Sequence, residues 1–559
     1  MYFHGIMPPS PARSRMSLPE FSRQLPLFGV DNLLGDSFAA TDPFRLFAER
    51  VYPLLAGARE QMADAYCLDN GRPGTEPVLL MGVSILQFMY RLPDRQAAEM
   101  LKYHLGWKLA LGQELGLSAF DPSTLTYFRQ RLLEHQQAKL AFDTILQGLV
   151  KAGLVARRSR QRLDSTHVLG LVARVSAVDR LRETIRLALE ELQSRPGRPE
   201  FWGLLWERYV ENKLDYRLEE AAMAVKFQET GADMQKLAEW IKVQGGEVAE
   251  GPQAKLLARV LEENFEVVEG RLEKRKPPSG AVRNPHEPEA ELAAKGKNKV
   301  WVGYKAQVAE TVGEEPLEKG EPTKEFLTAV VTQPAAQSDE TGMKQVLVEE
   351  KESGLETPVE MVVDGAYVSG ESLQKAQEAG YELTGPAQEP GAKNPGFKSD
   401  AFAVDVENRR AVCPAGLENS TCTRSTATET GKVLFKFGWG EQCAGCPLKD
   451  LCLGKNQTQR SLEVGEHHTH LQQRRKDQKT EEFKEKMHRR SAIEGTQSEM
   501  VRGHGMRQAR YRGLEKVRQQ NYLIGAACNV KRWIKRMVWE MDRQVNCALA
   551  QATGTVAVN

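Results

Sequence analysis

The sequence lacks a hydrophobic run long enough to cross a membrane. Its longest apolar stretch, Val78–Tyr90, is interrupted by Gly82, Ser84 and Gln87 and is shorter than the roughly 20 residues of a membrane helix. The first residues, Met-Tyr-Phe-His, also lack the basic start and apolar segment of a signal peptide. We therefore expect a soluble, cytoplasmic protein without a membrane partner.

The sequence also has almost no net charge, with 76 Lys and Arg against 75 Asp and Glu. Overall charge therefore gives no indication of nucleic-acid binding. The distribution is uneven, because Leu471–Arg536 contains 18 Lys and Arg against 7 Asp and Glu, whereas Val308–Glu360 is acidic. A basic block of this kind can form a phosphate-binding face.

Cysteines are too few and too clustered for a disulfide framework, since five of the eight lie between Cys413 and Cys452. Four thiolates would form a closed tetrahedral zinc site, which is structural rather than catalytic. The predicted ligands are Cys413, Cys443, Cys446 and Cys452. Other candidate ligands are Cys422, His467, His468 and His470, and the alternative to zinc is a set of reduced, unliganded cysteines.

The N-terminal region has a helical pattern from about residue 43 to 155. Asp121 and Pro122 are typical of a helix start, as cap and first helical residue. The helix that follows carries Arg129, Gln130 and Arg131, which could face DNA in a helix-turn-helix. The alternative is an ordinary bundle helix with a solvated face.

Strand patterns follow and alternate with helices. An α/β sheet is predicted, with antiparallel strands first and parallel crossovers after. The predicted strands are Arg160–Leu169, Val300–Val308, Phe326–Thr332, Val359–Asp364 and Tyr381–Thr384, and the predicted helices between them are Met343–Glu352 and Ser372–Ala379.

Two aspartates mark this sheet. Asp364 ends an apolar strand before Gly365, so we expect its carboxylate at the C-terminal edge of the sheet. Asp164 lies in the first strand, which can neighbour the strand of Asp364. Adjacent buried carboxylates are costly unless cations hold them, and oxygen ligands favour Mg²⁺ or Mn²⁺. For either aspartate alone, a turn or capping role is the alternative.

A third candidate segment is Met487–Arg502, which has the pattern of one amphipathic helix. Arg490 and Glu494 are four residues apart and would share a face, while Ile493 and Met500 would face a core. Taken alone, such a pair is typical of a solvated surface ion pair.

Together, the segments around Asp164, Asp364 and Arg490–Glu494 resemble the Asp-Asp-Glu (DDE) signature of bacterial insertion-sequence transposases with an RNase H-like catalytic domain. Two regions extend the resemblance. Residues Arg502–Gly505 and Arg510–Trp533 resemble the segment that follows the glutamate in one branch of the family. Residues Asn70–Leu132 resemble the family's N-terminal DNA-binding domain. Many relatives have a Tyr three residues before the Arg and a Lys seven after the Glu, where this chain has Met487 and Val501.

The resemblance implies that Asp164, Asp364 and Glu494 hold two Mg²⁺ or Mn²⁺ ions for DNA cleavage and strand transfer. Arg490 would orient Glu494 or contact a phosphate, and Arg502 is the cation nearest to the missing lysine position. Tyr367 would pack beside the second aspartate or meet DNA. The implied partners are double-stranded DNA, as element ends and target, and further copies of the chain in a dimer or larger assembly at the bacterial nucleoid.

The predicted architecture is an RNase H-like α/β core with a helical N-terminal domain and two insertions. Its parts are a flexible arm (1–45), a helical DNA-binding domain (46–155), the first part of the core (156–171 and 299–388), a helical insertion (172–298), a cysteine-rich insertion (389–475), the glutamate helix with C-terminal helices (476–540) and a tail (541–559).

The predicted function is transposition: binding of terminal inverted repeats, metal-dependent strand cleavage and strand transfer. Two alternatives remain, a metal-dependent nuclease without strand transfer and a catalytically inactive, transposase-derived DNA-binding protein. The presence of all three carboxylates, Asp164, Asp364 and Glu494, argues against the inactive relative.

Overall fold

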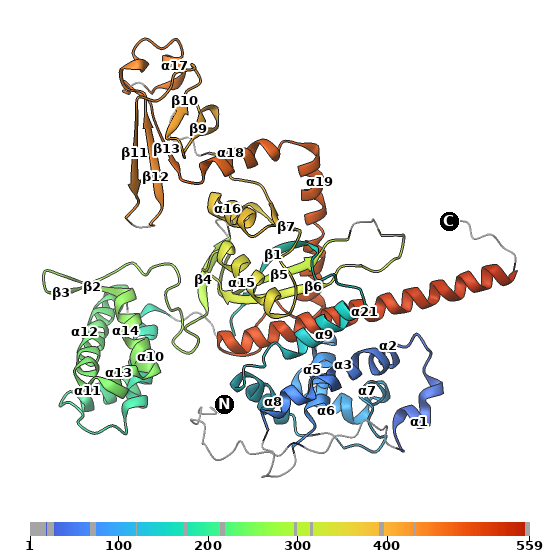
Figure 1. Ribbon diagram of the computed structural model, residues 1–559. Coiled ribbons are helices and arrows are strands. Elements are labelled where there is room, and N and C mark those ends of the chain that lie inside the picture. Colours follow the sequence, from blue (N-terminus) through green and yellow to red (C-terminus); the bar gives the residue numbers. More distant parts are fainter. Residues whose placement is uncertain are drawn as a thin grey trace.

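The computed structural model describes residues 18, 27–66, 74–118, 120–171, 176–212, 219–295, 299–313, 317–390, 396–428, 431–454 and 456–553. Residues 70–73, which contribute to the family resemblance, and most of the predicted arm lie outside these ranges. Figure 1 shows a central sheet with a helical N-terminal domain below it, a helical insertion to one side and the cysteine-bearing unit projecting above it.

The N-terminal domain is a set of helices around one apolar core. The predicted start of α8 is wrong by one residue, because the helix begins at Ser123 with Pro122 as its N-cap, and Asp121 precedes the cap and accepts a hydrogen bond from the Ser123 backbone. The prediction of an arm up to residue 45 is wrong in its last part, because Val30 is buried and its N–H donates to Gln113. The helices are α1 (Val30–Leu34), α2 (Pro43–Leu46), α3 (Tyr52–Gly57), α4 (Arg59–Ala63), α5 (Pro77–Met89), α6 (Asp94–Tyr103), α7 (Leu105–Ala110), α8 (Ser123–Glu134) and α9 (Leu140–Lys151).

The central sheet has the mixed α/β organisation that the sequence predicts. Strands run in the order β4-β5-β1-β7-β8, and β6 also pairs with β5. The pairs β1–β5, β5–β6 and β4–β5 are antiparallel, whereas β1–β7 and β7–β8 are parallel. The elements are β1 (Arg160–Leu169), β4 (Glu291–Lys295), β5 (Lys299–Thr311), β6 (Leu327–Pro334), α15 (Asp339–Glu352), β7 (Glu360–Val362), α16 (Gly370–Glu378) and β8 (Glu382–Thr384).

The insertion after β1 has its own apolar core but ends earlier than predicted. The predicted boundary at residue 298 is wrong, because β4 already belongs to the central sheet. This short segment has little strand pattern of its own, and its pairing with β5 makes it a strand. The elements of the insertion are α10 (Ala177–Leu192), α11 (Trp202–Trp206), α12 (Glu220–Gln244), α13 (Gly246–Glu250), α14 (Pro252–Asn264), β2 (Phe265–Val268) and β3 (Arg271–Lys274).

The cysteine-bearing unit consists of two small antiparallel sheets over a separate apolar core. It joins the rest of the molecule through α18 (His468–Asp477), which packs against α16. Its elements are β9 (Ala403–Asp405), β10 (Arg410–Val412), β11 (Thr421–Thr426), β12 (Val433–Gly438), α17 (Lys449–Cys452) and β13 (Ser461–Gly465).

The predicted single helix over Met487–Arg502 is wrong. The chain forms α19 (Glu481–Arg490), a turn, α20 (Ile493–Ser498) and a π-helical turn, η7 (Glu499–Gly503). At the turn, the Ser491 hydroxyl and N–H both donate to the carbonyl of His488, and this local bonding competes with helix continuation. Ile493 and Met500 are fully buried, as predicted.

The last helix, α21 (Leu514–Thr553), connects the two main parts of the molecule (Figure 1). It packs against β6 on one side and against α5 and α9 on the other. Asn529 fixes this packing, because its side-chain amide donates to the Leu327 carbonyl at 2.9 Å and its oxygen accepts from the Leu327 N–H at 2.8 Å. The helix continues through most of the predicted tail.

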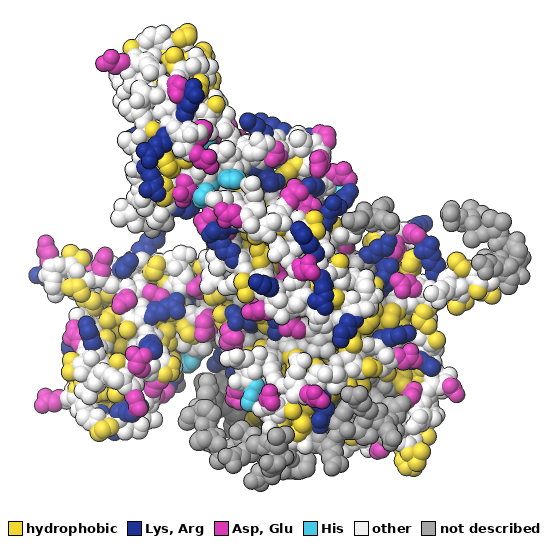
Figure 2. Space-filling model, viewed as in Figure 1, with side chains coloured by type: hydrophobic (Ala, Val, Ile, Leu, Met, Phe, Trp, Pro, Cys, Tyr) yellow, Lys and Arg dark blue, Asp and Glu magenta, His cyan; other side chains and the backbone are white. Residues whose placement is uncertain are grey.

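Charges of both signs are mixed over the surface seen in Figure 2, consistent with the near-zero net charge. Among the described helices, none combines the length and the apolar composition needed to span a bilayer.

Candidate active site

The sheet brings Asp164 and Asp364 to the same level. In the parallel pair of β1 and β7, Arg162 lies opposite Val362, and each aspartate comes two residues later in its chain. Asp164 therefore lies within β1, and Asp364 follows the C-terminal end of β7, with their side chains at one edge of the pairing. The two aspartates that the sequence singled out are thus neighbours.

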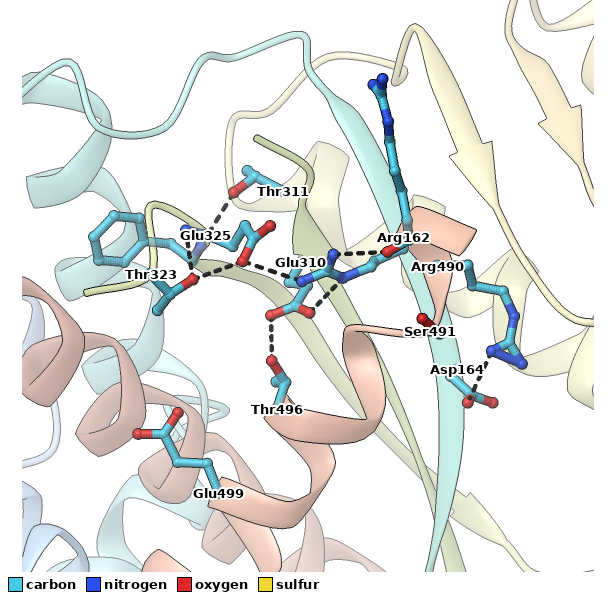
Figure 3. A network of polar contacts seen from close by, with 12 residues as sticks. Arg162, Asp164, Glu310, Thr311, Thr323, Glu325, Arg490, Ser491, Thr496 and Glu499 are labelled. Carbon is cyan, nitrogen blue, oxygen red and sulfur yellow. Dashed lines mark hydrogen bonds and ion pairs between the residues drawn. The ribbon is translucent and has the colours of Figure 1, made fainter. Parts of the chain in front are cut away.

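Arg490, the last residue of α19, lies between the two aspartates. Its guanidinium is 3.6 Å from Asp164 Oδ2 and 3.9 Å from Asp364 Oδ2. Figure 3 shows the Arg490 side chain pointing at Asp164 from the end of its helix. The Arg490 and Asp164 side chains are 14% and 15% exposed, and Asp364 is 38% exposed. One cation therefore offsets the repulsion between two partly desolvated carboxylates.

Glu494 lies in the first turn of α20, which packs against β1. Its side chain is exposed and makes no ion pair or hydrogen bond with other described residues. The carboxylate oxygens of Asp164, Asp364 and Glu494 do not all lie within 4.8 Å of one another. Among the described residues, a different group of side chains has this close spacing. An exposed side chain can change rotamer freely, so convergence of Glu494 on the aspartates remains a prediction.

A buried network holds the backbone on both sides of this turn (Figure 3), and sequence reasoning did not find it. Glu310 on β5, which is fully buried, accepts from Arg162 Nε at 2.7 Å and from Arg532 at 2.9 Å. The same glutamate accepts from the Thr496 hydroxyl on α20 at 2.7 Å. Arg162 also donates to the carbonyl of Arg489 at 3.0 Å.

The network therefore ties α19 one residue before Arg490 and α20 two residues after Glu494. The feature of the sequence that indicates this network is a charged residue at an inward-facing position of each strand, Arg162 in β1 and Glu310 in β5. The pairing of β1 with β5 places these two residues directly opposite each other.

Tyr367 is fully buried and its hydroxyl donates to Gln307 Oε1, so the predicted DNA contact for Tyr367 is wrong. Its ring packs beside the site instead. Burial, with Asp339, Asp164 and Asp364 adding to the effect, raises the pKa of Tyr367 well above its usual value.

The three DNA-facing candidates on α8 differ in their surroundings. Arg129 is buried and paired with Asp94 at 2.5 Å, and its guanidinium lies over the Tyr511 ring. Arg131 lies over the Tyr66 ring, 4.2 Å from the centroid. Gln130 is exposed and its amide donates to Glu134 on the same helix. Intramolecular packing thus accounts for both arginines, and Gln130 is the one of the three that faces solvent.

The four predicted zinc ligands line one cavity of the cysteine-bearing unit. They are Cys413, Cys443, Cys446 and Cys452. Cys422 lies on β11 and does not line this cavity, and His468 is buried elsewhere, at the start of α18. The backbone N–H of Arg460 donates to the Cys443 sulfur at 3.4 Å, so the cavity also offers a donor that suits a thiolate.

The sheet and its edge define a protein with a carboxylate-based site on a mixed α/β scaffold. Two family models match this chain, one described as a transposase DDE domain over residues 412–534 and one as a transposase domain (DUF772) over residues 34–131. The first match includes Arg490 and Glu494, and the second includes the predicted N-terminal domain up to Arg131. Both matches support similarity of this chain to the DDE transposases of insertion sequences. No curated protein and no solved structure matched it.

Proposed function

We propose that the chain catalyses DNA transposition, binding terminal inverted repeats, cleaving DNA strands and joining them to a target. The observation that carries this proposal is the placement of Arg490 within 3.6 and 3.9 Å of two level aspartates. The strand order supports an RNase H-like core, since β6-β5-β1-β7-β8 has β5 antiparallel to β1, and β7 and β8 parallel to it.

The donor set fits hard divalent cations. Asp164, Asp364 and Glu494 supply carboxylate oxygens, the ligands that Mg²⁺ and Mn²⁺ prefer. When bound, two such ions stabilise the attacking and leaving oxygens of an in-line phosphoryl displacement. The exposure of Glu494 and the partial exposure of Asp364 leave room for DNA to reach the site.

Arg490 has two roles in this proposal. Without cations it neutralises Asp164 and Asp364 and keeps them in place. With cations bound at the aspartates, the Arg490 guanidinium would be available to bind a backbone phosphate or to orient Glu494, which follows four residues later. The network of Glu310, Arg162 and Thr496 holds the turn between Arg490 and Glu494 in position for both roles.

DNA contacts are proposed at exposed cations near this site and at Gln130. Arg502 on η7 is exposed, and its side chain makes no ion pair with a described residue, so it is available to a phosphate. Gln130 is exposed on α8 of the N-terminal domain. Double-stranded DNA is the proposed partner, bound by a dimer or larger assembly on paired ends.

A structural zinc ion is proposed for the cavity lined by the four cysteines. Four thiolates close a tetrahedral site, and the small apolar core of this unit gains stability from such a crosslink.

Joining of a pre-cleaved end tests the proposed strand transfer. A duplex with the terminal repeat from the flanking DNA and a free 3′-hydroxyl is incubated with purified protein, Mg²⁺ and a target plasmid. We expect covalent joining of the end to the target, measured by gel shift of a labelled strand. Cleavage of uncut ends without joining would indicate a nuclease, and binding without either reaction would indicate an inactive relative.

A further inference from the structure

A third group of side chains that could hold a metal ion lies on η7, the residue after it and α21. Glu499 on η7, His504 just after it and Cys528 on α21 each offer a ligand atom, and these atoms all lie within 4.8 Å of one another. His504 and Cys528 are fully buried. The group shares no residue with the carboxylate site or with the four-cysteine cavity.

The His504 ring is buried, and its two nitrogens differ in their surroundings. Its Nδ1 lies 3.0 Å from the carbonyl oxygen of Phe88 on α5. A carbonyl can only accept, so Nδ1 carries the hydrogen, and in the neutral ring Nε2 presents a lone pair. Among the described residues, Nε2 has no hydrogen-bond partner.

This arrangement is typical of a histidine that binds a metal. In metal sites the second ring nitrogen usually donates to a carbonyl or carboxylate, which fixes the ring and its tautomer. The Phe88 carbonyl has this role here, and a lone pair on Nε2 is left for an ion. A thiol and a carboxylate within 4.8 Å complete a mixed set of ligands.

We propose that Glu499, His504 and Cys528 bind one divalent ion of the zinc class in a structural site. Sulfur and imidazole ligands favour Zn²⁺ over Mg²⁺, and three protein ligands leave the fourth tetrahedral position to water. The ion joins η7 to α21 and, through the Phe88 carbonyl, to α5 of the N-terminal domain.

The neighbouring Arg532 is compatible with a bound cation. It donates from Nε to Glu499 Oε2 at 2.9 Å, which leaves the other carboxylate oxygen for the ion. The charge of Arg532 is also balanced by Glu310, whose Oε2 lies 2.9 Å from Nη1 of Arg532. Binding forms a bond from the Cys528 sulfur to the ion and releases the thiol proton to solvent, so that a thiolate and a carboxylate balance two positive charges.

Arg532 also links this site to the glutamate helix, since it donates to the Thr496 hydroxyl on α20 at 2.7 Å. An ion on Glu499 therefore fixes the position of Arg532 and, through it, α20.

Zinc content of the full-length protein and of single variants tests the proposal. After dialysis against a weak chelator, Cys528→Ser and Glu499→Gln should each contain about one zinc ion less per chain than the unchanged protein. Cys547→Ser, at an exposed cysteine of the same helix, is the matched control and should keep the full zinc content.

Cys443→Ser separates this site from the four-cysteine cavity, because its zinc loss should add to that of Cys528→Ser. Loading with Co²⁺ gives a second readout. The absorption spectrum of the unchanged protein minus that of Cys528→Ser should show the absorption of a single thiolate ligand. If Cys528→Ser fails to fold, Glu499→Gln decides, since the amide can keep the shape of the side chain. Equal zinc and identical Co²⁺ spectra in the unchanged protein and the folded variants would overturn the proposal.

Discussion

Glu310 is the residue on which the polar interior around the site depends. Its carboxylate is fully buried and accepts from Arg162, Arg532 and Thr496, so it compensates two buried guanidinium groups at once. Removal of one member of such a network leaves uncompensated buried charge, which costs more than the pair contributes.

Glu310→Gln is therefore expected to lower the free energy of unfolding by about 3 kcal/mol. Urea denaturation of the variant and the unchanged protein measures this difference. Glu325→Gln is a suitable control, because Glu325 contacts the same Arg162 but is 21% exposed, and its loss should cost clearly less. Equal stability of Glu310→Gln and the unchanged protein would contradict the role of the network.

At this scale, Asp164 could be predicted from its place in a strand and Asp364 from its place before a glycine at a strand end. The partnership of Arg162 with Glu310 could not, because it depends on the register of two strands that are 148 residues apart in sequence at these positions. The sequence leaves open whether Tyr367 packs beside the second aspartate or meets DNA, because it gives no measure of burial for an aromatic residue next to a turn.

Helix α15 carries a buried carboxylate that makes the stability of the protein depend on pH. Glu350 is 1% exposed, and burial raises its pKa from 4.5 to about 7, with Thr328 and Gln161 partly offsetting the rise. Because the folded-state pKa is the higher one, the folded protein binds more protons between these values. The free energy of unfolding therefore falls as pH rises through this window.

Glu350→Gln should remove the loss of unfolding free energy with rising pH, because the amide does not titrate. This loss corresponds to about 3 kcal/mol between pH 4.5 and 7. Thermal unfolding at pH 5 and pH 8 measures it, and the variant should be the more stable protein at pH 8. Glu352→Gln, an exposed position at the end of the same helix, should leave the pH dependence unchanged. A Glu350→Gln protein that loses stability with pH as the unchanged protein does would refute this assignment.

Strands and helices with strong periodicity were predictable, and β1 has the predicted bounds Arg160–Leu169. The break between α19 and α20 was not, because helical periodicity continues across Ser491 while the Ser491 hydroxyl bonds locally to His488. The position of β4 likewise follows from its partner β5 rather than from its own residues.

At the scale of the whole molecule, α21 joins the N-terminal domain to the central sheet through α5, α9 and β6. One family match covers residues 34–131 and the other covers residues 412–534. The C-terminal match ends within α21, and this helix packs on α5 of the N-terminal match. The aspartates lie between the two matches, so their assignment depends on motif and geometry alone.

The most direct test is Mg²⁺-dependent cleavage of element-end DNA by Asp164→Asn, Asp364→Asn and Glu494→Gln, with binding of the same duplex measured in parallel. Glu481→Gln, an exposed position on α19, serves as the control. Each of the three changes should reduce cleavage by about a hundredfold or more while binding is retained, and the control should cleave normally. Normal cleavage by any one of the three variants would remove that residue from the site, and normal cleavage by Asp164→Asn and Asp364→Asn together would contradict the account.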